Sequence, residues 1–161
     1  MNLSDMLRTV RLFPIVTFVT AALLTGCAPP PPIPAPKPDP VTEAWYSQTV
    51  EELAALNREA DRLFRGGKLD EAATLIVKGE ALSNRLLAAP RPTLAAMESA
   101  SDLDDLYGRM FIANHNVGWA RLQFQKNLVR WRNWTPSSEN TARRLKQAQS
   151  AIAECDRLLA Q

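Results

Sequence analysis

From Val41 onward, apolar residues recur every three or four positions, the spacing that places them along one face of an α-helix. The pattern predicts a first helix that Thr42 caps and Gly66-Gly67 ends, and a second helix that ends at the Pro90–Pro92 segment. The two apolar faces comprise Tyr46, Val50, Leu53, Leu56, Ala60 and Leu63, and then Leu69, Ala72, Ala73, Ile76, Leu82, Leu86 and Leu87.

The same spacing predicts a long third helix from Ser101 or Asp102 to about Trp134, after a short helix or turn at 93–99. Its apolar stripe comprises Leu103, Leu106, Met110, Ala113, Val117, Ala120, Phe124, Leu128 and Trp131. Phe111, Leu122 and Val129 lie off this stripe, so we expect this helix to be buried on more than one side.

A turn over 135–138 leads into a last helix, whose apolar positions are Leu145, Ala148, Ile152, Cys155 and Leu159. The strict alternation that indicates a β-strand does not occur. Residues 41–161 are therefore predicted to form an all-α domain of four main helices, arranged as antiparallel hairpins.

The N-terminal pattern is different. Residues 12–24 carry no charge, and Arg8 and Arg11 stand just before them. A basic segment, a short apolar segment and small residues at a cleavage site are the layout of a secretory signal. The apolar run is too short for a permanent span, which needs about 20 residues. Residues 1–26 are therefore predicted to be a signal peptide.

The cleavage site itself, Leu24-Thr25-Gly26-Cys27, resembles the lipobox of bacterial lipoproteins. The resemblance implies that the Cys27 thiol receives a diacylglyceryl group, that the peptide is cut before Cys27, and that the new N-terminus is acylated. In that family an aspartate after the cysteine often retains the product in the inner membrane. Here Ala28 follows, so the resemblance implies a lipid-anchored envelope protein on the outer membrane, facing the periplasm.

Residues 27–40 follow the cleavage site as a separate segment, in which eight of the thirteen residues after Cys27 are proline. Such a segment favours extended polyproline II, which rises about 3.1 Å per residue. It is predicted to be a semi-rigid stalk that holds the helical domain up to roughly 40 Å from the anchor. The alternative is that it is a ligand for a proline-recognition groove.

The net charge and the cysteine and histidine content limit which kinds of ligand and cross-link the chain is expected to have. Removing the signal takes away Asp5, Arg8 and Arg11 and lowers the formal net charge from +2 to +1, which makes no case for nucleic acid. If Cys27 is lipidated, Cys155 has no partner for a disulfide within the chain. With His115 as its one histidine, the chain is not expected to bind a metal or another cofactor.

Residues 53–86 resemble a tetratricopeptide repeat, a helix–turn–helix unit of 34 residues. The positions that carry the resemblance are Leu53, Leu56, Ala60, Leu63, Leu69, Ala72, Ile76 and Gly79, with the turn Gly67-Lys68-Leu69-Asp70-Glu71-Ala72. Glu59 stands where the family has a large apolar residue, and a second unit near 116–120 matches poorly. The resemblance implies a degenerate repeat, and the alternative is a plain four-helix bundle.

No catalytic constellation stands out, and we expect no enzyme activity and no small-molecule substrate. His115 lies between two asparagines, which favours a hydrogen-bonded structural role. Cys155 lies on an apolar stripe and is predicted to be a core residue. Four acids, Glu98, Asp102, Asp104 and Asp105, fall around a predicted helix start, where carboxylates favour the helix dipole over metal binding.

One stretch suggests binding. Lys126, Arg130 and Trp134 are spaced four apart, so they share one face of the third predicted helix, opposite Phe124, Leu128 and Trp131. Indole and cationic groups together can bind an anionic, partly apolar partner. The alternative is that Trp131 is a core residue and the cations form a solvated helix end.

These features favour a lipid-anchored adaptor that binds a protein partner in an envelope assembly. The alternatives are a self-associating structural lipoprotein that contacts the cell wall, and an accessory of a small envelope enzyme. The sequence identifies neither the partner nor the pathway.

The lipobox predicts the outcome of one substitution. Replacing the Cys27 thiol in Cys27→Ser removes the nucleophile that takes the lipid, so the variant should leave the membrane fraction or accumulate uncut. Detergent phase separation and the mass of the mature chain measure both effects. Normal cleavage with unchanged partitioning into detergent would contradict a lipid anchor at this residue.

Overall fold

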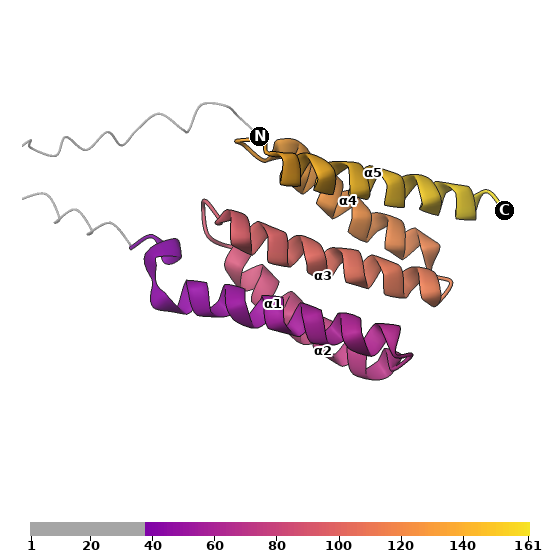
Figure 1. The fold of residues 1–161 in the computed structure, drawn as a ribbon, viewed down its shortest axis with the longest axis horizontal. Helices are drawn as coiled ribbons and strands as arrows, with labels where there is room; N and C mark the ends of the chain where they lie inside the picture. The colour runs from indigo at the N-terminus through magenta and orange to yellow at the C-terminus, as the bar shows by residue number, and fades with distance from the viewer. Residues whose placement is uncertain (1–37) are drawn as a thin grey trace, which may run out of the picture. The chain divides into compact units, whose positions relative to one another are not determined.

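Five α-helices and one 3-10 turn make up the described part of the chain, residues 38–161 of a computed structural model (Figure 1). They are the 3-10 turn η1 (Pro40–Thr42), α1 (Ala44–Arg65), α2 (Leu69–Leu87), α3 (Leu94–Ala113), α4 (Val117–Asn133) and α5 (Glu139–Leu159). The predicted all-α class is confirmed. The predicted signal peptide, Cys27 and the stalk up to residue 37 lie outside the described residues.

The first two helices follow the predicted apolar faces and form an antiparallel hairpin over the predicted repeat-like segment. Tyr46, Leu53 and Ala60 of α1 are buried in one core cluster with Ala72, Ile76 and Leu86 of α2. Thr42 does not cap α1, because it lies in η1 and its hydroxyl donates to the carbonyl of Asp39 at 2.8 Å. At the other end, Gly67 adopts φ 74°, and the amides of Gly67 and Lys68 bond back to α1.

The prediction of one long third helix is wrong. The helix begins earlier, after Thr93, whose hydroxyl accepts the amide of Ala96, and it is divided into α3 and α4 at residues 114–116. His115 adopts φ 60°, and its amide bonds to the carbonyl of Ile112 at 3.0 Å. The amide of Asn116 bonds to the carbonyl of Phe111 at 2.8 Å. This is the same closure that Gly67 makes, so the domain has five helices rather than four.

The helices stack around α3, which packs against α1 and α2 on one side and against α4 on the other, while α4 pairs with α5 (Figure 1). Gly108 of α3 allows the close approach to α4, because a Cβ there would lie 2.5 Å from the ring of Phe124. Ser138 caps α5 through a reciprocal pair of hydrogen bonds with Thr141, as the predicted turn over 135–138 requires.

No helix within residues 38–161 combines the length and the apolar character needed to cross a bilayer.

The two left-handed turns predict opposite responses to substitution. A side chain at positive φ is strained, so His115→Gly should raise the free energy of unfolding by about 0.5 kcal/mol. Gly67→Ala should lower it by about 1 kcal/mol, and this change isolates the backbone because a Cβ there would meet nothing within 4 Å. Urea unfolding measures both. A destabilised His115→Gly variant would mean that the imidazole contributes more than the strain costs.

Candidate functional site

The binding face predicted from Lys126, Arg130 and Trp134 does not form as one exposed surface. The side chain of Arg130 is only 8% exposed, and its Nη2 lies 2.8 Å from Oδ2 of Asp104 on α3. It also donates to Oδ1 of Asn127. The expectation that Arg130 faces outward is therefore wrong, because α3 places a carboxylate opposite it.

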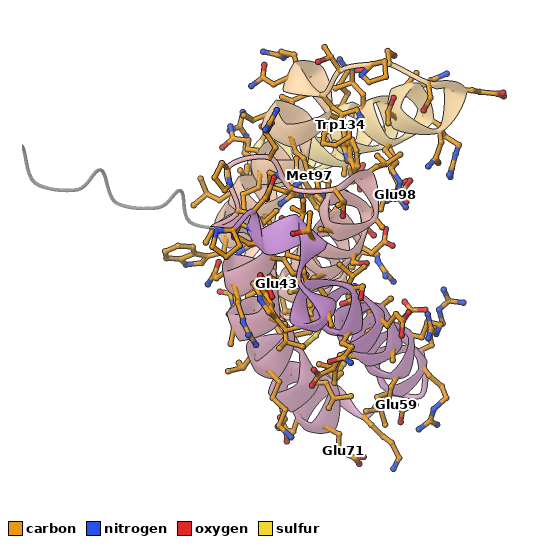
Figure 2. The ribbon with its side chains drawn as sticks, turned by 90° about the vertical axis from the view of Figure 1, so that its left-hand side faces the viewer. Glu43, Glu59, Glu71, Met97, Glu98 and Trp134 are labelled. Carbon is orange, nitrogen blue, oxygen red and sulfur yellow. The ribbon has the colours of Figure 1, made fainter. Side chains whose placement is uncertain are left out.

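Lys126 and Trp134 are only partly available. The side chain of Lys126 is 51% exposed, and its Nζ lies 3.5 Å from Oδ1 of the same Asp104. Trp134 follows the end of α4 and is half-buried, with its ring edge-on to Trp131. In the end-on view of Figure 2, Trp134 is drawn toward the same edge as Met97 and Glu98 of α3, and Glu59 and Glu71 are drawn toward the opposite edge.

Trp131 packs inward as predicted. It is buried, and its indole N–H donates to Oγ of Ser101 at 2.9 Å. The guanidinium of Arg144, from α5, lies 5.5 Å from the centre of the indole ring. The tryptophan that the sequence assigned to the core therefore joins α4 to α3 and α5.

The four acids of the sequence prediction do not surround a helix start. They follow one another along α3, and cations from other helices reach three of them. Arg144 of α5 places Nη1 2.6 Å from Oδ1 of Asp102 and Nε 3.8 Å from Oε1 of Glu98. Arg130 and Lys126 of α4 reach Asp104. Three acids of α3 and three cations of α4 and α5 therefore form a charge-paired interface between these helices.

The remaining acid, Asp105, bonds within α3 and to α5. Its Oδ2 lies 3.1 Å from Nε of Arg109, and Oδ1 accepts from Gln147 at 3.3 Å. Arg109 in turn reaches Asp61 of α1 at 2.8 Å. Charged groups on α3 thus contact helices on both of its sides.

Two buried amides bind the backbone of α3 from opposite sides. Nδ2 of Asn57, on α1, donates to the carbonyl of Ser99 at 2.7 Å. Nδ2 of Asn127, on α4, donates to the carbonyl of Ser101 at 2.9 Å. Because a buried amide without a partner is costly, these bonds fix where α1 and α4 lie along α3.

Within residues 38–161, Cys155 and His115 occupy positions that indicate structural roles. Cys155 is fully buried against Ala120 and Phe124, which confirms its predicted core position. Burial raises the pKa of its thiol, so the nucleophilic thiolate is disfavoured. His115 is exposed in the α3–α4 turn, and the bond it makes there is through its backbone amide rather than the side-chain bond we expected.

Two cavities within residues 38–161 differ in size and enclosure. A small, partly enclosed polar cavity of about 10 Å³ lies between α3, α4 and α5, lined by Ser101, Asp102, Asp105, Asn127, Arg144, Gln147 and Ala148. This is the size of one water molecule. An open depression of about 640 Å³ lies over Glu139, Asn140, Ala142, Arg143 and Lys146 of α5. Among the described residues, no three His, Cys, Asp or Glu side chains are arranged to hold a metal ion.

The feature that the sequence prediction missed is an exposed apolar face on α4. Trp119, Leu122 and Val129 are 60%, 48% and 54% exposed. The expectation that Leu122 and Val129 are buried on a second side is wrong, because α3 and α5 both pack on the side of α4 that carries Ala120 and Phe124. Lys126 falls between Leu122 and Val129 at helical spacing. We call these four residues, Trp119, Leu122, Lys126 and Val129, the α4 face.

No protein-family model, curated protein or solved structure matches this chain.

Proposed function

We propose that this chain is a lipid-anchored adaptor of the bacterial cell envelope, which binds a protein partner through the α4 face. One observation carries the proposal: Trp119, Leu122 and Val129 expose large apolar side chains on one face of a single helix. Exposed apolar side chains that lie singly are ordinary, whereas a contiguous row indicates an interaction site.

The ion pairs between the helices support a binding function rather than a catalytic one. Acids of α3 form ion pairs with Lys126 and Arg130 of α4 and with Arg144 of α5. Catalytic groups need a concave site in which titratable side chains converge on a substrate. The ion pairs of Asp104, Asp102 and Glu98 instead join helices, which is a structural use.

The anchor comes from the N-terminal sequence. Leu24-Thr25-Gly26-Cys27 supports lipidation at Cys27, and Ala28 supports the outer membrane, with the domain in the periplasm. The proline-rich residues after Cys27 would hold the helices away from the bilayer, within reach of a partner.

Chemical crosslinking in intact cells, followed by purification of the tagged chain, tests this function. We expect the wild-type chain to capture a distinct envelope protein. Leu122→Glu should abolish the capture, because it places a charge in the apolar contact. Val77→Glu is the matched control, since Val77 is an exposed apolar residue at 62% on α2.

The outcomes separate the alternatives. Capture of copies of this chain alone would favour the self-associating lipoprotein. If Leu122→Glu and Val77→Glu lose the captured protein equally, or both retain it equally, α4 is not the binding helix.

A further inference from the structure

The α4 face has the width and length of a single helix-to-helix contact. Its residues follow the spacing three, four, three, so they form one narrow row along the helix. From Trp119 to Val129 the row covers about 15 Å at 1.5 Å per residue. That length matches about three turns of a partner helix.

The charge of α4 has one sign. The helix contains Arg121, Lys126, Arg130 and Arg132 and no acid. Two of the arginines are neutralised within the domain, since Nε of Arg121 lies 2.6 Å from Asp156 and Arg130 is paired with Asp104. Lys126 shares Asp104 with Arg130, so this group of two cations and one carboxylate keeps one net positive charge. The outward charge therefore comes from Lys126, which is half-exposed in the α4 face, and from Arg132, which is exposed near its Val129 end.

We infer that the α4 face binds an acidic amphipathic helix of a partner protein. The apolar residues of that helix would pack between Trp119, Leu122 and Val129, and its carboxylates would meet Lys126 and Arg132. The α4 face supplies apolar surface and positive charge, so an apolar row flanked by acids is its complement. This inference rests on the proposed function and names the chemistry of its partner.

A second copy of this chain is a poorer occupant. Two-fold packing of α4 on α4 would bring Lys126 and Arg132 of each copy into one contact, with no acid on either helix to offset them.

A bilayer is also a poorer occupant of the α4 face than an acidic helix. Anionic membrane surfaces attract clusters of about four to eight basic residues, whereas the α4 face and its edge offer Lys126 and Arg132.

Site-specific photocrosslinking of the full chain in intact cells tests the inference. A photoreactive amino acid is placed at Leu122 or Val129, with Val77 on α2 as the control position. We expect crosslinks to one protein from Leu122 and Val129 and none from Val77. Peptide mapping should place the crosslinked site in a segment with apolar residues at helical spacing and acids beside them.

Charge variants then separate electrostatic recognition from apolar contact alone. Lys126→Glu/Arg132→Glu should lower the crosslink yield about tenfold or more. Lys146→Glu, which changes an exposed lysine of α5, should leave the yield unchanged. Because Lys126 lies near Asp104, Lys126→Gln/Arg132→Gln is the second variant; it removes the attraction without adding repulsion and should still lower the yield.

The following outcomes of the crosslinking would overturn the inference. These outcomes are a crosslink to lipid, to a second copy, to residues 1–37 of the same chain, or to a protein segment without acids. Equal yield from Val77, no crosslink at Leu122 and Val129, or a yield that the charge variants leave unchanged would also overturn it. If chemical crosslinking still captures an envelope protein that Leu122→Glu loses, the proposed function stands and only the acidic partner is wrong.

Discussion

The ion pair between Asp104 of α3 and Arg130 of α4 is the interaction on which the arrangement of the helices depends. Both side chains are largely buried, so each needs the other to offset the cost of leaving water. The helix α3 has neighbours on both sides, and a carboxylate at its centre can be tolerated only where a neighbouring helix supplies a cation. The converse holds at α5, where the largely buried guanidinium of Arg144 is paired with the more exposed carboxylate of Asp102.

This pairing decides what the domain can present to the outside. A basic stretch between Lys126 and Lys146 looks like a binding surface when only the sequence is considered. In the folded chain Arg130 and Arg144 form ion pairs with acids of α3. Trp131 is buried beside them. What faces outward on α4 is an apolar row with Lys126 in its centre. The proposed binding chemistry follows from what the ion pairs leave exposed.

The apolar periodicity predicted the helical class and most of the core, because burial on one face of a helix is a local pattern. Tyr46, Leu53, Phe124 and Cys155 are buried as that pattern requires. The break between α3 and α4 was missed because the usual signal for a left-handed turn is glycine, as at Gly67, and here His115 occupies that position. Two flanking asparagines were the available signal, since asparagine is frequent at helix ends.

The candidate site was less predictable, because its contacts join residues far apart in the chain. Asp104 and Arg130 are separated by 26 positions, and Asp102 and Arg144 by 42. Helical spacing states which residues share a face, and it does not state which neighbour covers that face. For that reason Arg130 was expected outside, and Leu122 and Val129 were expected inside.

A double-mutant cycle on Asp104 and Arg130 tests the charge-paired interface most directly. The free energies of unfolding of Asp104→Asn, Arg130→Gln and the double variant are measured in urea. Each single change should destabilise the domain by about 3 kcal/mol, and the double change by clearly less than the sum, with a coupling of roughly 2 kcal/mol. The exposed pair of Glu59 and Arg62 on α1 is the control and should show little coupling. Additive effects of the Asp104 and Arg130 changes would contradict a structural role for this ion pair and would return Arg130 to the candidates for partner binding.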